Sequence, residues 1–231
     1  MYESLKKECC RANLMLPQLG LVLYTFGNVS CVDRKNGVFA IKPSGVEYSK
    51  LTPEGIVIVD FDGRIVEGRA RPSSDTPTHA VLYREYPEIG GIVHTHSCYA
   101  TAWAQALREI PIYGTTHADH LPYAVPCTEW MEDERIEKAY EEETGHQIVE
   151  LFRRRQLSVR EVEMVLVGGH GPFTWGKDAS KAVYNARVLE ELARMAQLTE
   201  AIRPQPETLK SAIIRCHYRR KHGPNAYYGQ K

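Results

Sequence analysis

Hydrophobic residues recur with two different periods along this chain, and the period changes from segment to segment. Apolar residues three or four positions apart are typical of an amphipathic helix, whereas short apolar or alternating runs are typical of a strand. The first pattern predicts helices over residues 5–16, 78–86, 99–107, 133–155, 179–200 and 206–220. The second predicts strands over residues 25–32, 38–42, 56–61, 64–68 and 92–96, and a hairpin over residues 161–175.

Turn residues separate these elements. The segments 33–37 and Asp62-Gly63 favour tight connections between antiparallel strands, and Pro17 is expected to end the first helix. Residues 110–130 are rich in Pro, Gly and His and are expected to be irregular. Interleaved helices and hairpins predict an α/β fold in which a mixed, mostly antiparallel sheet has helices on both sides. With 231 residues, a single domain over residues 1–231 is expected.

Composition excludes several classes of function. The 29 basic and 29 acidic residues balance, which argues against nucleic acid as a partner. The six cysteines are scattered without the spacing of a zinc finger and are expected to be reduced. No segment approaches the roughly 20 apolar residues of a membrane span, and the first residues do not form a signal peptide. We therefore expect a cytoplasmic protein with no membrane partner.

The triplet His94-Thr95-His96 follows an apolar run and is the strongest chemical signal. Side chains alternate along a strand, so both imidazoles project from the same face. Imidazole suits zinc and its neighbours, and a catalytic site commonly uses three protein ligands. His170, between an apolar run and glycines, is the best candidate for a third ligand. The alternative is two histidines hydrogen-bonded on a strand surface.

Three turns offer the chemistry of a phosphate site. Residues 73–79 place two serines and Asp75 before a predicted helix, where hydroxyls and free N–H groups can receive an anion. Residues 27–30 and 42–45 repeat this chemistry, and Lys42 adds a positive charge. Helix capping and ordinary turns are the alternative. Together with a metal pair, the three turns indicate a small phosphorylated ligand.

Two further segments are unusual for loops. Thr115-Thr116-His117-Ala118-Asp119 combines hydroxyls with a carboxylate that suits proton transfer or a turn. The chain end, from about His217 to Lys231, is basic and then carries Tyr227 and Tyr228. Aromatic residues are uncommon in disordered tails, so we expect this tail to dock on the protein or on a neighbouring subunit.

Seven motifs, spread over nearly the whole chain, carry a family resemblance. They are Gly27-Asn28-Val29-Ser30, Ile41-Lys42-Pro43-Ser44-Gly45, the segment 72–79, Gly91-Ile92-Val93-His94-Thr95-His96-Ser97, Gly114-Thr115-Thr116-His117-Ala118-Asp119, His170-Gly171-Pro172-Phe173 and Ala226-Tyr227-Tyr228-Gly229-Gln230. Through them the chain resembles the class II aldolase superfamily, and specifically its L-ribulose-5-phosphate 4-epimerase branch. The aldolase relatives place Glu where this chain has Asp75, and in them that Glu is the base.

The resemblance implies a role for each motif. Zinc, or another divalent ion such as manganese, is expected on His94, His96 and His170, with Asp75 as a ligand or close neighbour. The implied phosphate and substrate contacts are Gly27, Asn28, Lys42, Ser44, Gly45, Ser73, Ser74, Thr115, Thr116, Glu141 and His217. Asp119 and Tyr228 become the two proton-transfer residues. Tyr228 is expected to come from the adjacent subunit of a homotetramer.

The implied activity interconverts L-ribulose 5-phosphate and D-xylulose 5-phosphate. The C4–H is not adjacent to the ketone, and no Gly-x-Gly-x-x-Gly follows a strand to hold a dinucleotide for oxidation. The remaining route is reversible cleavage of the C3–C4 bond, assisted by the metal as a Lewis acid. A class II aldolase acting on L-fuculose or L-rhamnulose 1-phosphate is the nearest alternative, and a metal-dependent hydrolase is another. Arabinose and ascorbate catabolism both need the epimerase chemistry.

Overall fold

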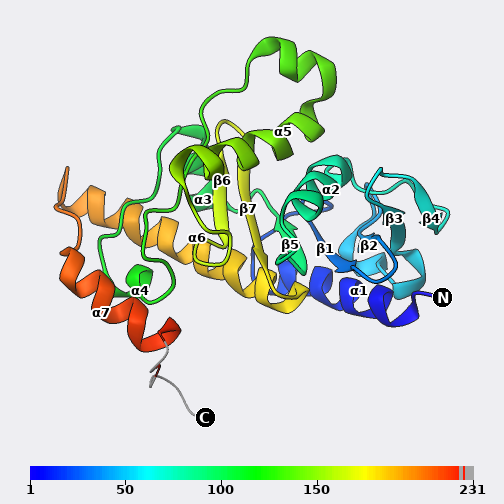
Figure 1. Ribbon diagram of the computed structural model, residues 1–231, viewed down its shortest axis with the longest axis horizontal. Helices are drawn as coiled ribbons and strands as arrows, with labels where there is room; N and C mark the ends of the chain where they lie inside the picture. Colours follow the sequence, from blue (N-terminus) through cyan, green and yellow to red (C-terminus); the bar gives the residue numbers. More distant parts are fainter. Residues whose placement is uncertain (224–225, 227–231) are drawn as a thin grey trace.

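The computed structural model describes residues 1–223 and residue 226. Its helices and strands alternate along the chain (Figure 1). The α-helices are α1 (Glu3–Gln18), α2 (Thr76–Glu85), α3 (Cys98–Gln105), α4 (Thr115–Ala118), α5 (Asp133–Arg155), α6 (Ala179–Ile202) and α7 (Ser211–His222). The strands are β1 (Asn28–Asp33), β2 (Val38–Ile41), β3 (Val57–Asp60), β4 (Ile65–Glu67), β5 (Gly91–His94), β6 (Met164–Val167) and β7 (Gly171–Gly176).

The described strands form one seven-stranded sheet in the order β4-β3-β2-β1-β5-β7-β6. Every pairing between these strands is antiparallel, and the parallel contribution within the described chain is an isolated bridge between Cys127 and Leu166. The expected mostly antiparallel sheet is confirmed. Strand β5 lies inside the sheet, between β1 and β7, so its end is flanked by strands on both sides.

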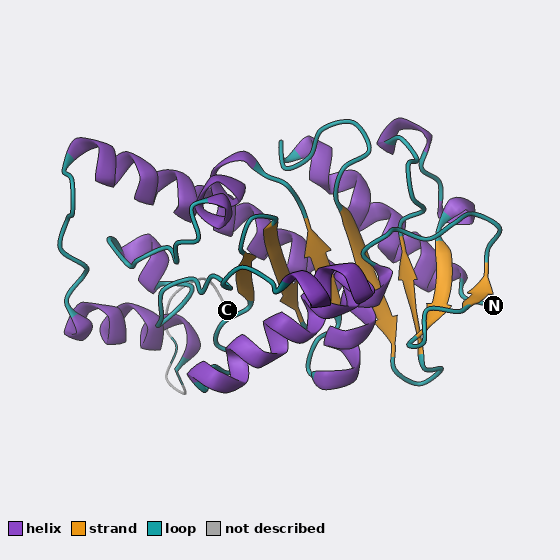
Figure 2. Cartoon of the chain, turned by 90° about the horizontal axis from the view of Figure 1, so that it is seen from above, coloured by secondary structure: helices purple, strands orange, loops and turns teal. Residues whose placement is uncertain are grey.

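Helices cover both faces of the sheet (Figure 2). In β3, Val57 and Val59 join the apolar cluster under α2 and α5, whereas Ile58 joins the cluster under α1 and α6. A third cluster packs α3 against α6 and β6. Successive side chains of a strand point to opposite faces, so alternate residues of β3 pack into two different apolar clusters. The three-layer arrangement confirms the α/β prediction.

Most elements differ from their predicted bounds by a few residues. Helix α1 includes Pro17 and ends one residue later, at Gln18. Proline lacks the N–H for a helical hydrogen bond and crowds the carbonyl four residues earlier, so a helix is not expected to continue far beyond it. The last helix starts at Ser211 rather than at Pro206. Within the segment expected to be irregular, the single turn α4 forms. Helix α5 is interrupted at Ala139, whose backbone is not helical, so its first residues project from the molecule (Figure 1).

Helix α7 packs beside α4, at the end of the molecule remote from β3 and β4 (Figure 1). The beginning of the predicted docking tail thus contacts its own chain through Asp119, which accepts hydrogen bonds from His217 and Arg220. Residues 224–225 and 227–231, including Tyr228, lie outside the described residues. In the described chain, no helix is long and apolar enough to cross a membrane.

Candidate active site

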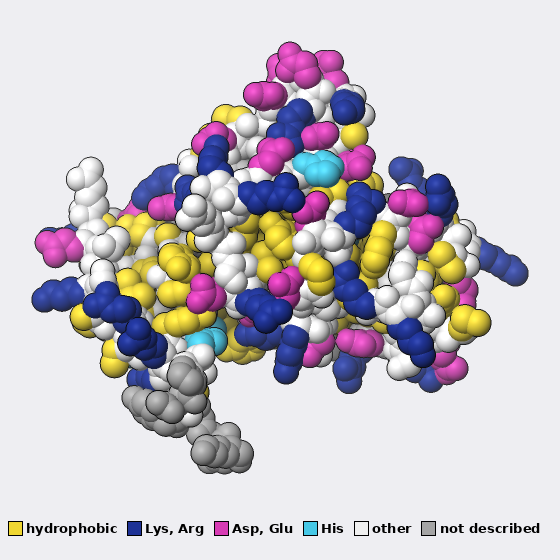
Figure 3. Space-filling model, in the orientation of Figure 1, with side chains coloured by type: hydrophobic (Ala, Val, Ile, Leu, Met, Phe, Trp, Pro, Cys, Tyr) yellow, Lys and Arg dark blue, Asp and Glu magenta, His cyan; other side chains and the backbone are white. Residues whose placement is uncertain are grey.

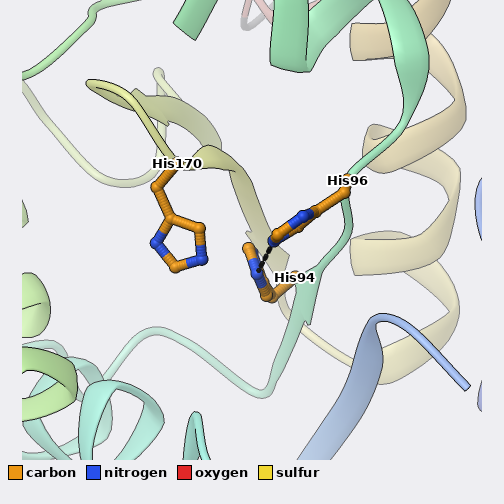
Figure 4. A group of neighbouring side chains, drawn as sticks. All are labelled: His94, His96 and His170. Atoms are coloured by element: carbon orange, nitrogen blue, oxygen red, sulfur yellow. Dashed lines mark hydrogen bonds between the residues drawn. The ribbon is translucent and has the colours of Figure 1, made fainter. Parts of the chain in front are cut away.

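Three imidazoles converge at the end of strand β5. His94 is the last residue of β5, His96 follows two residues later, and His170 lies in the turn between β6 and β7 (Figure 4). One nitrogen from each ring lies within 4.8 Å of the others, and the ring centroids are 4.7–5.1 Å apart. The structure therefore brings together the three candidate ligands chosen from the sequence. The expectation that one strand carries both His94 and His96 is wrong, because β5 ends at His94.

The hydrogen bonds around these rings suit a cation. His94 Nδ1 lies 3.0 Å from the carbonyl oxygen of Pro172, which fixes Nδ1 as the donor and leaves Nε2 as the nitrogen that can accept a hydrogen bond or bind a metal. That Nε2 faces His96 Nε2 at 3.1 Å, and the buried Nδ1 of His170 has no hydrogen-bond partner. Inward-facing nitrogens and an orphaned buried nitrogen match the donor set of a divalent metal site.

The protonation of the cluster favours the same interpretation. Burial, reinforced by His94 and His96, lowers the pKa of His170 to about 3. Partial burial and the neighbouring His94 also lower the pKa of His96. Both imidazoles are therefore neutral near pH 7, which is the form that binds metals.

Asp75 lies beside the imidazoles rather than within the three-histidine group. Its Oδ2 accepts a 2.6 Å hydrogen bond from Asn28 Nδ2, and it makes no side-chain cap on α2, so the capping interpretation of this aspartate is wrong. Burial by itself raises the pKa of Asp75, but the nearby His94, His79 and His170 and the Asn28 bond outweigh burial, so the pKa lies below its usual value. A charged carboxylate thus flanks the three rings.

A cleft of about 500 Å³ opens onto the histidines. Of the predicted contacts, it is lined by Gly27, Asn28, Lys42, Ser44, Gly45, Ser73, Ser74, Asp75 and Glu141 together with His94, His96 and His170. Gly27 has a φ of +74°, and an added Cβ would lie 2.9 Å from the carbonyl oxygen of His94. Glycine is therefore required where the chain enters β1 against the end of β5.

Backbone bonds bring the two serine turns together. Ser44 N–H donates to the carbonyl of Arg71, and Ser73 N–H donates to the carbonyl of Lys42. These two amides are therefore already paired, which corrects the expectation that they are free for an anion. The serine hydroxyls and Lys42 are the donors that the turns present to the cleft, and the Ser73 hydroxyl also lies 3.4 Å from Asp75 Oδ2, to which it donates.

Lys42 is a buried cation with no ion-pair partner among the described residues. Its Nζ lies 3.2 Å from the carbonyl of Thr25 and 3.4 Å from that of Pro43, and 4.9 Å from the centre of the Tyr48 ring. Its side chain is 2% exposed, and burial lowers its pKa to about 8. A buried, unpaired ammonium group is costly, so this position favours an anionic ligand.

Tyr140 is a cleft residue that the sequence did not reveal. Its ring lies 5.7 Å from the His170 ring, and burial followed by the charge of Asp75 raises its pKa. Tyr140 and Glu141 reach the cleft because α5 breaks at Ala139, and the Glu141 carbonyl then accepts a hydrogen bond from the Thr78 hydroxyl. No sequence signal marks this break, since Ala is a strong helix former.

The other predicted residues form a separate group. Asp119 accepts hydrogen bonds from His217 Nδ1 at 3.0 Å and from Arg220 at 3.0 and 3.1 Å, and Lys221 lies 3.4 Å away. Neither Asp119 nor Thr115, Thr116 or His217 lines the cleft of its own chain. Figure 3 shows basic side chains at the end of the molecule where α7 lies, below yellow apolar patches. Within one chain, this carboxylate and the histidine cluster belong to different surfaces.

The chain is similar to proteins of known class over nearly its full length. Residues 7–197 match the family described as Class II Aldolase and Adducin N-terminal domain. L-ribulose-5-phosphate 4-epimerase UlaF of Salmonella paratyphi B and that of Salmonella typhi are each 49% identical over 229 residues, which covers 99% of this chain and 100% of each relative.

Solved structures have the same fold. An L-fuculose 1-phosphate aldolase superposes with a TM-score of 0.77 at 24% identity, covering 93% of this chain and 94% of the aldolase. An L-fuculose-1-phosphate aldolase from Thermus thermophilus gives a TM-score of 0.68 at 24% identity, covering 89% of this chain and 98% of that aldolase. The family match over residues 7–197 and the 49% identity over 229 residues show that the chain belongs to the class II aldolase and adducin family.

Proposed function

We propose that this protein is an L-ribulose-5-phosphate 4-epimerase, which interconverts L-ribulose 5-phosphate and D-xylulose 5-phosphate. The observation that carries the proposal is one cleft with two kinds of group: three imidazoles at one end, and an unpaired buried lysine with serine hydroxyls. A phosphorylated sugar whose reaction requires a metal fits both kinds of group, because its phosphate suits the lysine and the hydroxyls and its ketone suits a metal held by the imidazoles. The 49% identity with proteins named as this epimerase supports the choice of substrate.

His94, His96 and His170 would hold a divalent cation, with zinc as the first choice and manganese as the alternative. Three nitrogen ligands suit zinc and leave a coordination position open for substrate oxygen. When bound, the cation would supply a Lewis acid next to the ketone, where negative charge accumulates as the C3–C4 bond breaks. Asp75 adds a negative charge at this end of the cleft and hydrogen-bonds Asn28, which pairs with His94 across β1 and β5.

Breaking C3–C4 leaves the bonding electron pair on C3, in the enediolate of dihydroxyacetone, and turns C4 and C5 into glycolaldehyde phosphate. This aldehyde must stay bound and present its opposite face before the enediolate attacks it and the bond re-forms. Lys42 and the hydroxyls of Ser44, Ser73 and Ser74 are placed to hold its phosphate. A held phosphate lets the aldehyde rotate about its anchor without leaving the cleft. Binding energy spent on the unreactive phosphate therefore maintains the geometry of the reacting carbon.

The two faces of the aldehyde need two proton-transfer groups, and we assign them to Asp119 and Tyr228. Asp119 takes the 4-hydroxyl proton of one epimer. The Tyr228 hydroxyl donates a proton to the aldehyde oxygen on the opposite face when the bond re-forms, since a phenol with a pKa near 10 is neutral at pH 7 and carries that proton. Asp119 does not line the cleft of its own chain, so we propose a homotetramer in which a neighbouring subunit completes each site, with Thr115, Thr116 and His217 beside Asp119.

The test is an assay of the purified protein with L-ribulose 5-phosphate before and after chelation. We expect formation of D-xylulose 5-phosphate, loss of this activity on chelation, recovery with zinc or manganese, and a tetramer by light scattering. Glycolaldehyde phosphate should not accumulate. Accumulation of the free aldehyde would instead identify an aldolase, and activity that survives complete removal of metal would refute the proposal. We place the enzyme in the cytoplasm, in a pathway of arabinose or ascorbate breakdown.

A further inference from the structure

A carboxylate on α6 binds the backbone that follows the histidine cluster in the sequence. Glu190 Oε1 accepts a hydrogen bond of 2.9 Å from the backbone N–H of Tyr99, and its Oε2 accepts one of 3.0 Å from that of Ala100. These residues form the first turn of α3, which begins at Cys98, two residues after His96. Glu190 therefore binds the backbone immediately after His96, a ligand of the proposed metal site.

This end of α3 has no cap of its own. The first N–H groups of a helix have no partners within the helix, and Ser97 at the N-cap position makes no side-chain cap. Glu190 satisfies two of these donors at once and places negative charge at the positive end of the helix dipole. Because α3 has only eight residues, fraying of its first turn would release a large part of it.

The other end of α3 is tied to α6 by a different bond. Trp103 Nε1 donates to the carbonyl of Ala193 at 3.0 Å, and the Trp103 side chain is buried. The two ends of α3 are thus connected to the same helix independently. Of the two connections, the Glu190 pair is next to His96 and the Trp103 bond lies toward the opposite end of α3.

His96 depends on its backbone for orientation more than His94 does. The His94 ring is fixed by the Pro172 carbonyl and is stacked on Phe173 at 4.2 Å, whereas the His96 ring makes one hydrogen bond in the described chain, to His94 Nε2. His96 lies on the segment between β5 and α3 (Figure 4). A shift of the first turn of α3 would therefore move His96 while leaving His94 in place.

We propose that Glu190 is a positioning residue for His96, which sets the affinity and geometry of the metal site by clamping the start of α3 to α6. The inference rests on the metal site of the proposed function, but it concerns a residue outside the cleft. Side chains that orient metal ligands from outside typically change metal affinity by 10- to 100-fold when they are replaced.

The test compares Glu190→Gln with Trp103→Phe, which removes the α3–α6 bond distant from His96. Metal-free proteins are titrated with Co²⁺ against a chromophoric chelator, and the visible absorption of bound Co²⁺ reports ligand geometry. Circular dichroism and thermal unfolding of the metal-free proteins show that each is folded and how much stability each has lost. Glu190→Asp, which keeps the charge but shortens the side chain, serves as the second variant.

We expect Glu190→Gln to bind Co²⁺ about tenfold more weakly than wild type, with an altered visible spectrum, and Glu190→Asp to do the same. Trp103→Phe should bind within twofold of wild type although its unfolding temperature falls. Equal affinity in wild type and both Glu190 variants would overturn the inference, and so would an equal loss in Trp103→Phe. Failure of the wild-type protein to bind Co²⁺ would instead refute the proposed metal site itself.

Discussion

Lys42 allows a quantitative prediction about proton uptake. Burial without an anionic partner lowers the pKa of its ammonium group from 10.5 to about 8. A shift of this size corresponds to roughly 3 kcal/mol of cost for the charged form at neutral pH. The folded chain then binds fewer protons than the unfolded chain between about pH 8 and 10.5, so this group makes the protein more stable as pH rises through that range.

A bound phosphate dianion supplies the missing partner and should return the pKa of Lys42 toward its ordinary value. At pH 8.5, a group with a pKa of about 8 is roughly three-quarters neutral, so binding should take up about 0.75 proton. Near pH 7 Lys42 is already about nine-tenths charged, and its uptake should fall to roughly 0.1 proton. This pH dependence distinguishes Lys42 from surface lysines.

Calorimetric titration with inorganic phosphate at pH 8.5, in two buffers of different ionisation enthalpy, measures this uptake. Lys42→Met should abolish the uptake and, in turnover with L-ribulose 5-phosphate, raise KM by about 30-fold or more, since a buried charge pair that loses one partner costs roughly 2–5 kcal/mol. Lys50→Met, which changes an exposed lysine nearby in the sequence, is the matched control. Unchanged uptake in Lys42→Met would show that the phosphate does not meet this lysine.

Other perturbations test other parts of the structure. His170→Ala should remove most bound metal, as measured by elemental analysis, and most turnover of L-ribulose 5-phosphate, with little change in fold. Full metal content would exclude His170 as a ligand. Asp119→Asn should weaken the docking of α7 by about 1–3 kcal/mol and speed hydrogen exchange over residues 211–222, and unchanged exchange would contradict the role of its three basic neighbours. Burial alone raises the pKa of Asp119, but the bonds from Arg220 and His217 and the nearby Lys221 outweigh burial and lower it. Its stabilising contribution should therefore be present above about pH 4 and be lost as pH falls through the lowered pKa, which acid unfolding of wild type and Asp119→Asn would reveal. Trp175→Ala should destabilise the fold by roughly 3–5 kcal/mol in urea unfolding because this buried ring fills the core under α5, and a loss below about 1 kcal/mol would contradict that packing.

The spacing of apolar residues and the turn residues predicted which helices and strands form and which of their side chains share a face. The strand period places His94 on the face of β5 that carries Ile92, toward α2 and α5, and the glycine-flanked His170 reaches it from the neighbouring hairpin. Asp75 shows the limit of such rules. Its position before α2 has the pattern of a cap, yet its carboxylate accepts a hydrogen bond from Asn28 in strand β1.

Tertiary contacts determine what the sequence could not show. The break in α5 at Ala139 occurs at a residue with high helix propensity, so Tyr140 could not be assigned to the cleft in advance. The Glu190 carboxylate is 90 positions away from the amide it bonds at Ala100. Asp119 was predicted as a site residue, but it does not line the cleft of its own chain. In the proposed tetramer its distance from the histidines would depend on contacts between subunits, which local sequence patterns do not reveal.

The register of the sheet has a consequence for how members of this fold can diversify. Asn28, His94 and Phe173 occupy one rung across β1, β5 and β7. Sliding any of these strands by one residue would turn its side chains to the opposite face, so the pairing register of these three strands can hardly change. The walls of the cleft come instead from connections whose length is free to vary. Bond-breaking chemistry and substrate choice are therefore physically separable here, and new selectivity can arise by remodelling loops around an unaltered reaction centre.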